Sequence, residues 1–263
     1  MTRAETAYHG DMGEHFAAQA TDSVYNAHTD RPAMLKLAGD VRGLRVLDLG
    51  CGAGHYAAEL LKSGAGQVVG VEGSETLLRA ARERLEGAMG MRHGAVDAHY
   101  AHGGEVDAHH GGADAHHDGV VLHLHDLEEP LAFLDDESFD LVVMALVYHH
   151  VDARGQLLAE IRRVLRPGGV LLVSTTHPVG DWAYFGDSYF AEERVELPFG
   201  EGFSISYWRM SLEKFLGELL GAGFVLEELA EPRATEDARS IDPRRYDKTH
   251  SRPTFLAVRL RRP

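Results

Sequence analysis

The chain has 263 residues, of which 44% are hydrophobic and 25% charged, and 41 Asp and Glu against 26 Lys and Arg give it a formal charge of −15. These proportions are typical of globular proteins and exclude collagen-like, low-complexity and wholly disordered chains. Because an acidic surface repels polyanions, no nucleic-acid partner is expected.

The sequence predicts neither a membrane anchor nor a disulfide framework. The longest uninterrupted apolar run, Leu141 to Tyr148, has eight residues, whereas a helix that spans a bilayer needs about 20. The first residues contain no apolar signal core, so we expect a cytoplasmic protein without membrane contact. The single cysteine, Cys51, excludes an internal disulfide and any multi-cysteine zinc site.

Strand-length apolar runs alternate with helical patterns, which predicts an α/β fold with a parallel sheet and crossover helices. One helix begins after Ser74 as N-cap, and another runs from about Ala153 to Leu165 with Asp152 as its cap. A helix over 211–220 and a polar, charged loop over 231–254 belong to the C-terminal part. The predicted strands are 45–50, 67–72, 119–125, 139–145, 170–175, 224–229 and 255–262.

Three segments interrupt the alternation, and we interpret them as additions to one domain that covers residues 1–263. An N-terminal helical cap is expected over 1–41. An insertion rich in His and Gly covers 89–118, and an aromatic segment covers 177–208.

A glycine-rich loop follows the first predicted strand. Gly50, Gly52 and Gly54 lie between this strand and a helix that starts at His55, and this context favours a ligand site in which the backbone approaches the ligand closely. Glu72 follows Gly52 by twenty residues at the end of the second strand. At that spacing a carboxylate accepts hydrogen bonds from the hydroxyls of a ribose.

Two cofactor classes use this geometry. A dinucleotide places its pyrophosphate on the helix N-terminus and favours Gly or Ala where this chain has His55. Asp48 just before the loop is unfavourable beside a pyrophosphate but suits the cationic amino group of an amino acid. The charge argument therefore favours S-adenosylmethionine.

Four motifs in order resemble those of the class I S-adenosylmethionine-dependent methyltransferases, in particular the small-molecule group that contains the ubiquinone and menaquinone methyltransferases. They are Val46-Leu-Asp-Leu-Gly-Cys-Gly-Ala-Gly54 with Glu72, His125-Asp-Leu-Glu-Glu-Pro130, Phe139-Asp-Leu-Val-Val143 and Arg163-Val-Leu-Arg-Pro-Gly-Gly169. The resemblance implies a Rossmann-like, doubly wound sheet of seven strands with the last strand antiparallel.

The resemblance also implies residue roles. The methionine part of the cofactor would lie on the glycine loop, the ribose on Glu72 and its neighbours, and the adenine beside the loop after the third strand. Tyr25 would belong to an N-terminal helix that folds over the cofactor. The implied cofactor-binding residues are Tyr25, Asp48, Gly50, Cys51, Gly52, Glu72, Gly73, Ser74, Asp126, Leu127 and Ala145.

Histidines that follow the fourth and fifth strands are candidates for a general base. His149 and His150 follow the fourth strand and His177 the fifth; a base assists methyl transfer only when the acceptor still carries its proton. His150 is preferred because it matches a histidine often present in the family, and the alternative is that these residues pack or cap helices. Cys51 at the helix turn could be a nucleophile, but we interpret it as a packing residue because no base accompanies it.

Nine aromatic residues between Trp182 and Trp208 predict a lid that shields the transferred methyl group and favours a planar, apolar or cationic acceptor. Nine of the seventeen histidines lie between His93 and His125; we interpret this glycine-rich run as a solvated insertion that binds metals adventitiously, and we predict no metal site.

The sequence thus predicts a methyltransferase that uses S-adenosylmethionine, with S-adenosylhomocysteine as product, on an O, N or C atom of a small molecule. The alternatives are a nicotinamide-dependent oxidoreductase of Rossmann type and a metal-binding protein that works through the histidine-rich insertion. The sequence leaves a homodimer open.

Overall fold

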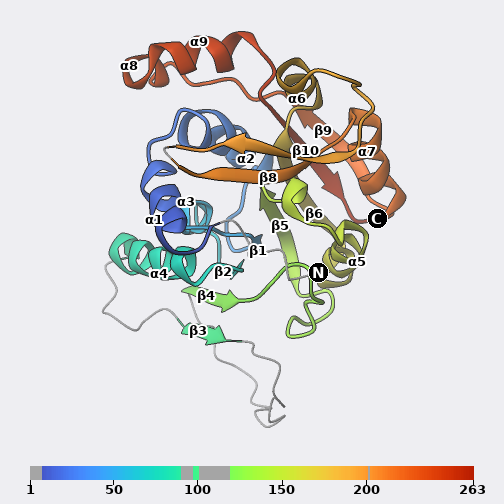
Figure 1. Ribbon diagram of the computed structural model, residues 1–263. Helices are drawn as coiled ribbons and strands as arrows, with labels where there is room; N and C mark the ends of the chain where they lie inside the picture. Colours follow the sequence, from blue (N-terminus) through green and yellow to red (C-terminus); the bar gives the residue numbers. More distant parts are fainter. Residues whose placement is uncertain (1–7, 90–96, 101–118, 201) are drawn as a thin grey trace, which may run out of the picture.

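The computed structural model describes residues 8–89, 97–100, 119–200 and 202–263. Within these ranges eight strands form one sheet in the order β3-β4-β2-β1-β5-β6-β10-β9 (Figure 1). Strand β10 is antiparallel to β6 and β9, and the other neighbours are parallel. The bounds are β1 Arg45–Leu49, β2 Gln67–Glu72, β3 Asp97–Tyr100, β4 Gly119–Leu124, β5 Phe139–Ala145, β6 Leu165–Thr176, β9 Val225–Ala230 and β10 Phe255–Arg261.

The predicted doubly wound sheet of seven strands with an antiparallel final strand is confirmed. Strand β3 adds an eighth strand at the edge, parallel to β4. It comes from the histidine-rich segment, for which we predicted no regular element; the rest of that segment, 90–96 and 101–118, lies outside the described residues.

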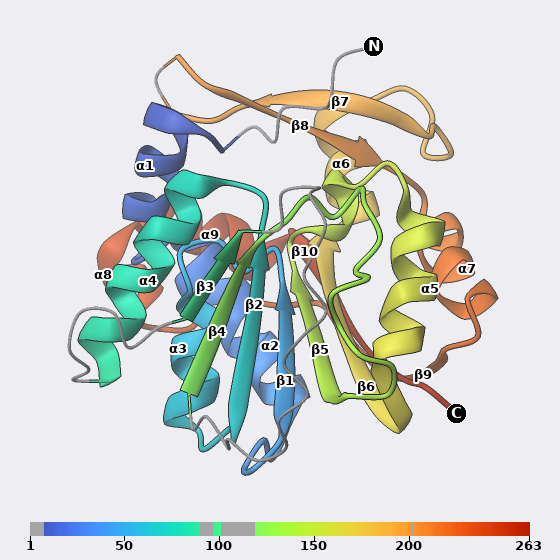
Figure 2. The ribbon, with the colours of Figure 1, turned by 90° about the horizontal axis from the view of Figure 1, so that it is seen from below.

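Helices cover both faces of the sheet because the strands are apolar on both sides (Figure 2). One apolar core joins α2, α3 and α4 to the sheet, and the other joins α5 and α7. The bounds are α2 Arg31–Ala38, α3 His55–Lys62, α4 Glu75–Met89, α5 Arg154–Val164 and α7 Leu212–Gly221.

The two predicted helix caps have different outcomes. The Ser74 hydroxyl accepts a hydrogen bond from the Leu77 amide at 3.3 Å, which confirms the N-cap of α4. The predicted cap of α5 is wrong, because the N-cap residue is Ala153, without a side-chain hydrogen bond. Asp152 instead accepts from Arg194 at 2.7 Å and from the Trp208 indole at 2.5 Å. Both of these partners of Asp152 belong to the aromatic segment.

The aromatic segment forms helix α6 (Pro178–Phe185) and a separate hairpin of β7 (Glu193–Pro198) and β8 (Ser204–Arg209). Figure 2 shows this hairpin lying across the carboxyl ends of the parallel strands, with α1 (Gly10–Gln19) at its turn. His15 lies 5.7 Å from Phe199 and Phe16 lies 5.9 Å from it, between ring centroids. The N-terminal cap and the hairpin are therefore in contact.

The predicted loop over 231–254 is wrong, since it contains α8 (Ala238–Ile241) and α9 (Pro243–Ser251) at the periphery of the molecule (Figure 1). The Asp242 carboxylate caps α9 by accepting from the Arg245 amide at 3.0 Å. A small core of Val24, Ala234, Ala238 and Tyr246 holds the pair. A helix with so few apolar residues gives no periodic signal in the sequence.

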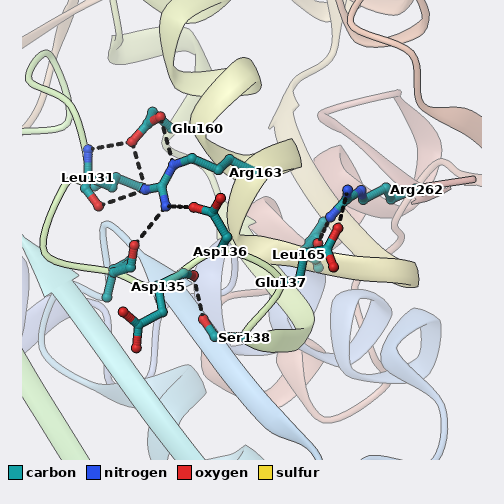
Figure 3. Close-up of polar contacts among 10 residues, drawn as sticks. Leu131, Asp135, Asp136, Glu137, Ser138, Glu160, Arg163, Leu165 and Arg262 are labelled. Carbon is teal, nitrogen blue, oxygen red and sulfur yellow. Dashed lines mark hydrogen bonds and ion pairs between the residues drawn. The ribbon is translucent and has the colours of Figure 1, made fainter. Parts of the chain in front are cut away.

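The loop between β4 and β5 is held by Arg163 of the fourth motif (Figure 3). Its guanidinium donates to the Leu131 carbonyl at 2.9 Å and the Leu134 carbonyl at 2.8 Å, and it pairs with Glu160 and Asp136. Arg163 therefore anchors this loop to α5.

We expect Arg163→Met to lower the free energy of unfolding by about 2–3 kcal/mol, because it leaves buried carbonyls without donors and removes charge-assisted hydrogen bonds. Arg166→Met is the matched control, since Arg166 is half exposed and pairs with Asp140 at the surface, and such pairs contribute about 1 kcal/mol or less. Urea unfolding of both variants measures the difference; equal losses would contradict this role of Arg163.

Candidate active site

The glycine loop joins β1 to α3 through three glycines with positive φ angles, 66° at Gly50, 54° at Gly52 and 75° at Gly54. A Cβ atom at Gly50 would lie 2.4 Å from the Val147 side chain, and one at Gly54 would lie 3.1 Å from Ala81. Only glycine satisfies both the backbone angle and the space.

Glu72 ties this loop to the turn that follows β2. Its carboxylate is 7% exposed and accepts hydrogen bonds at 2.8 Å from the amides of Gly52 and Ser74. Burial raises the pKa of Glu72, while amides that include that of Gly73 lower it. The four predicted residues Gly52, Glu72, Gly73 and Ser74 thus lie together.

Asp48 lies on β1 just before the loop and is 1% exposed. Its Oδ2 atom has no hydrogen-bond partner. Burial and the neighbouring Glu72 charge raise the pKa of Asp48 to about 7, against a smaller lowering by the Ala57 amide. A buried acceptor without a partner is typical of a functional site and costs stability.

A pH-dependent effect of Asp48→Asn on stability follows. Because the pKa of this carboxyl rises from 3.8 to about 7 on folding, its ionisation opposes folding above pH 4, by up to about 4 kcal/mol above pH 7. We therefore expect Asp48→Asn to unfold at a higher temperature than the unsubstituted protein at pH 8, with the gap closing towards pH 4. Calorimetric Tm values measure this, and a gap independent of pH would contradict it.

Cys51 is 6% exposed and lies beneath the loop, where a Cβ on Gly70 would approach its sulfur to 3.0 Å. Burial first, and then the charges of Asp48 and Glu72, raise the pKa of the thiol. A thiol in this state is a poor nucleophile, so these contacts favour the packing role.

The residues predicted to face the adenine follow β4 and β5. Asp126 comes directly after β4 and accepts from the Glu128 amide at 3.0 Å. The neighbouring His125 amide donates to the carbonyl of Glu72, which places this turn beside the end of β2. Leu127 is partly buried against the core, and Ala145 is the last residue of β5. All lie at the carboxyl edge of the sheet.

Tyr25, predicted to lie over the cofactor, contacts the C-terminal part of the chain. Its ring packs against Phe255 of β10, with 6.2 Å between centroids, and lies beneath Arg245 and Lys248 of α9.

Tyr8, which the sequence did not single out, lies at the ribose-side residues instead. Its carbonyl accepts from the Ser74 hydroxyl at 2.5 Å, and its ring lies 4.6 Å from Phe16 and 5.9 Å from His150. Burial and the Glu72 charge raise the pKa of its phenol. No sequence pattern around Tyr8 predicts this position.

His149 and His150 form the short helix η2 (Tyr148–His150) under the hairpin. His149 is 4% exposed, with Nδ1 at 3.0 Å from the Thr175 hydroxyl. The Nδ1 atom of His150 lies 3.1 Å from the carbonyl of Ser206. Since a carbonyl only accepts, Nδ1 carries the proton and Nε2 keeps its lone pair. Burial lowers the pKa of His150 to about 4, so the ring is neutral at pH 7.

His177 is engaged through both ring nitrogens. Nδ1 accepts from the Val179 amide at 3.1 Å and caps α6, while Nε2 lies 3.0 Å from Glu231. This arrangement matches a capping role better than that of a base.

Comparisons with known proteins agree with this geometry. A family model described as a methyltransferase domain matches residues 47–173. Residues 47–173 are a methyltransferase domain. It contains Asp48, the glycine loop, Glu72 and the pair His149 and His150, whereas Tyr25 and His177 lie outside it.

Two solved structures share the fold of the chain. An S-adenosylmethionine-dependent methyltransferase from Mesorhizobium loti is 22% identical, with a TM-score of 0.62 over 92% of this chain and all of that one. The 1,6-didemethyltoxoflavin-N1-methyltransferase from Burkholderia thailandensis, solved with S-adenosylhomocysteine, is 20% identical, with a TM-score of 0.57 over 95% of this chain and 87% of that one. The class I methyltransferase fold is therefore confirmed.

Among curated proteins, a demethylmenaquinone methyltransferase from Listeria welshimeri is 30% identical over 67% of this chain and 64% of its own length. The matched region spans 50% and 64% of the lengths of two of these curated relatives. None of the helices in the described part of the chain combines the length and apolarity needed to cross a bilayer. In the same part, no group of three or more His, Cys, Asp or Glu side chains could hold a metal ion.

Proposed function

We propose that the methyltransferase domain binds S-adenosylmethionine and transfers its methyl group to an O, N or C atom of a small molecule. The observation that carries this proposal is Glu72, buried at the edge of the sheet and bonded to the amides of Gly52 and Ser74. An ionised carboxylate has about four acceptor positions, more than the amides of Gly52, Gly73 and Ser74 occupy. The remaining acceptor capacity suits a hydroxyl group of a ribose.

The charges near the glycine loop favour a sulfonium cofactor over a dinucleotide. The Asp48 carboxylate, whose Oδ2 atom has no partner, suits the ammonium group of the methionine part and opposes a pyrophosphate. His55 stands where a dinucleotide site favours Gly or Ala. The methyl group would leave the sulfonium sulfur as the acceptor atom forms its bond to carbon, with S-adenosylhomocysteine as product.

His150 is the base that we propose for acceptors that still carry a proton. Its Nδ1 atom donates to the carbonyl of Ser206 in the hairpin, which leaves the lone pair on Nε2. Methyl transfer is an in-line displacement in which positioning supplies much of the rate, and proton removal adds to it.

The hairpin and α1 are proposed to close over the transferred methyl group. His150, Tyr207 and Phe185 bring rings together beneath the hairpin, an environment that suits a planar or apolar acceptor. The demethylmenaquinone methyltransferase among the relatives makes a quinol one candidate acceptor. We also infer a cytoplasmic enzyme, since a single cysteine that is free and buried suits a reducing compartment.

Transfer of tritium from methyl-labelled S-adenosylmethionine tests the activity. The probes are a quinol, a catechol, an aromatic amine and a heterocyclic nitrogen compound, each with formation of S-adenosylhomocysteine recorded. Acceptor-dependent formation of S-adenosylhomocysteine supports the proposal. Tight cofactor binding without transfer to any acceptor class would contradict a small-molecule methyltransferase.

A further inference from the structure

A second buried carboxylate lies on the same side of the sheet as Asp48. Asp30 ends the π-helix η1 (Asn26–Asp30) of the N-terminal cap and precedes α2. It is 1% exposed, although it belongs to a polar, irregular segment. Turns of π-helix are rare and occur frequently at functional sites.

The contacts of Asp30 leave one oxygen atom without a partner. Its Oδ2 atom accepts from the Tyr56 hydroxyl at 2.6 Å, and Tyr56 lies two residues after Gly54 in α3. Its Oδ1 atom has no hydrogen-bond partner. The adjacent Arg31 donates to the carbonyl of Ala20 at 3.0 Å. Arg31 therefore acts on the buried Asp30 through its charge, while its hydrogen bond goes to Ala20.

The register of the sheet brings Asp30 and Asp48 to one place. Asp48 of β1 pairs with Val143 of β5, and Ala145, two residues further on, pairs with Ser174 of β6. Since alternate residues share a face, Asp48, Ala145 and Ser174 face the layer of α2 and α3.

Burial raises the pKa of Asp30 to about 6, against a lowering by the nearby hydroxyls of Tyr56 and Ser174. Burial first, and then the charges of Asp30 and Asp48, raise the pKa of Tyr56. The two acids thus flank Tyr56 at the carboxyl edge of the sheet. Each has one oxygen atom without a partner.

We propose that Asp30 is a second acid that receives the ammonium group of the cofactor's methionine part, together with Asp48. This inference rests on the proposed function. An ammonium group has three N–H donors and one positive charge, which satisfies two unpartnered carboxylate oxygens at once. Through Asp30, the N-terminal cap becomes part of the cofactor site rather than a cover alone.

The test compares two ligands that differ only at the amino-acid end. S-adenosylhomocysteine carries this end, and 5′-methylthioadenosine lacks it. We expect Asp30→Asn to weaken binding of S-adenosylhomocysteine by about 10- to 100-fold, because a neutral amide replaces a charged acceptor, and to leave binding of 5′-methylthioadenosine within about twofold. Asp22→Asn, at an exposed acid of the same segment, is the matched control and should change neither.

Calorimetric titrations with both ligands give the affinities, and thermal unfolding confirms that each variant is folded. If Asp30→Asn does not fold, Asp30→Ser, whose shorter polar side chain fits the same space, replaces it. Equal losses for both ligands, or unchanged affinity for S-adenosylhomocysteine, would overturn the role of Asp30. If the unsubstituted protein binds neither ligand, the proposed function itself fails, which separates the two failures.

Discussion

Glu72→Gln should weaken binding of S-adenosylhomocysteine by about 30-fold, or about 2 kcal/mol. The substitution keeps the shape of the side chain but removes the charge that strengthens hydrogen bonds from the ribose hydroxyls. It also replaces one carboxylate oxygen with an amide NH₂ group. That group cannot accept the hydrogen bond which the backbone amide of Gly52 or of Ser74 donates to the oxygen. Calorimetric titration of the purified variant measures the loss.

The control for Glu72 is Glu75→Gln, three residues later on the exposed side of the first turn of α4. It changes the formal charge by the same amount, so a general electrostatic effect would appear in both variants. Binding of 5′-methylthioadenosine should also weaken in Glu72→Gln, because this ligand keeps the ribose. Unchanged affinity for both ligands would remove the ribose role from Glu72.

His150→Ala should lower kcat by about 100- to 1000-fold for an acceptor that carries its proton, because proton transfer by a positioned base contributes about 10²- to 10⁴-fold. Affinity for S-adenosylhomocysteine should stay within about twofold. Since the pKa of His150 is about 4 in the structure, the activity of the unsubstituted enzyme that depends on this base should fall only as pH drops towards 4.

His150→Asn separates a base from a structural tie. An asparagine amide can still donate to the Ser206 carbonyl as Nδ1 does, but it offers no basic nitrogen. If His150 only fastens the hairpin, His150→Asn should recover most of the activity lost in His150→Ala. If it is the base, both variants should remain slow, and an acceptor without a transferable proton should be methylated at nearly the normal rate.

The local sequence was sufficient to predict the residues at the centre of the site. Gly50, Gly52 and Gly54 follow a buried strand directly, and Glu72 ends the next one, so the parallel register alone brings them together. The resemblance to the methyltransferase family supplied Asp126 and Ala145, which lie at the same carboxyl edge. For the glycine loop and Glu72 the chemistry is encoded within a strand, a turn and the start of a helix.

The contacts of the N-terminal cap could not be predicted in this way. Tyr8 and Asp30 reach the site only because α1 and α2 pack against α4 and the sheet, and neither residue lies in a periodic pattern. Tyr25, placed by resemblance alone, packs against α9. Long-range packing of a variable segment leaves no signature in its own sequence.

The hairpin shows the same limit. Its aromatic residues were visible in the sequence, but the side chains that fasten it, Arg194 and Trp208 on Asp152, were assigned no such role. Asp152 has the residue type and position of a helix cap, and its actual partners come from more than 40 positions away along the chain. Competition between a local and a distant partner is decided only in three dimensions.

A calorimetric titration of the metal-stripped protein with S-adenosylhomocysteine, beside an identical titration with NADH, tests the central claim most directly. The glycine loop, the buried Glu72 carboxylate and the unpartnered Oδ2 atom of Asp48 predict one-to-one binding of S-adenosylhomocysteine at micromolar concentration and no binding of NADH. Binding of NADH without binding of S-adenosylhomocysteine would contradict the account and make the site that of a dinucleotide.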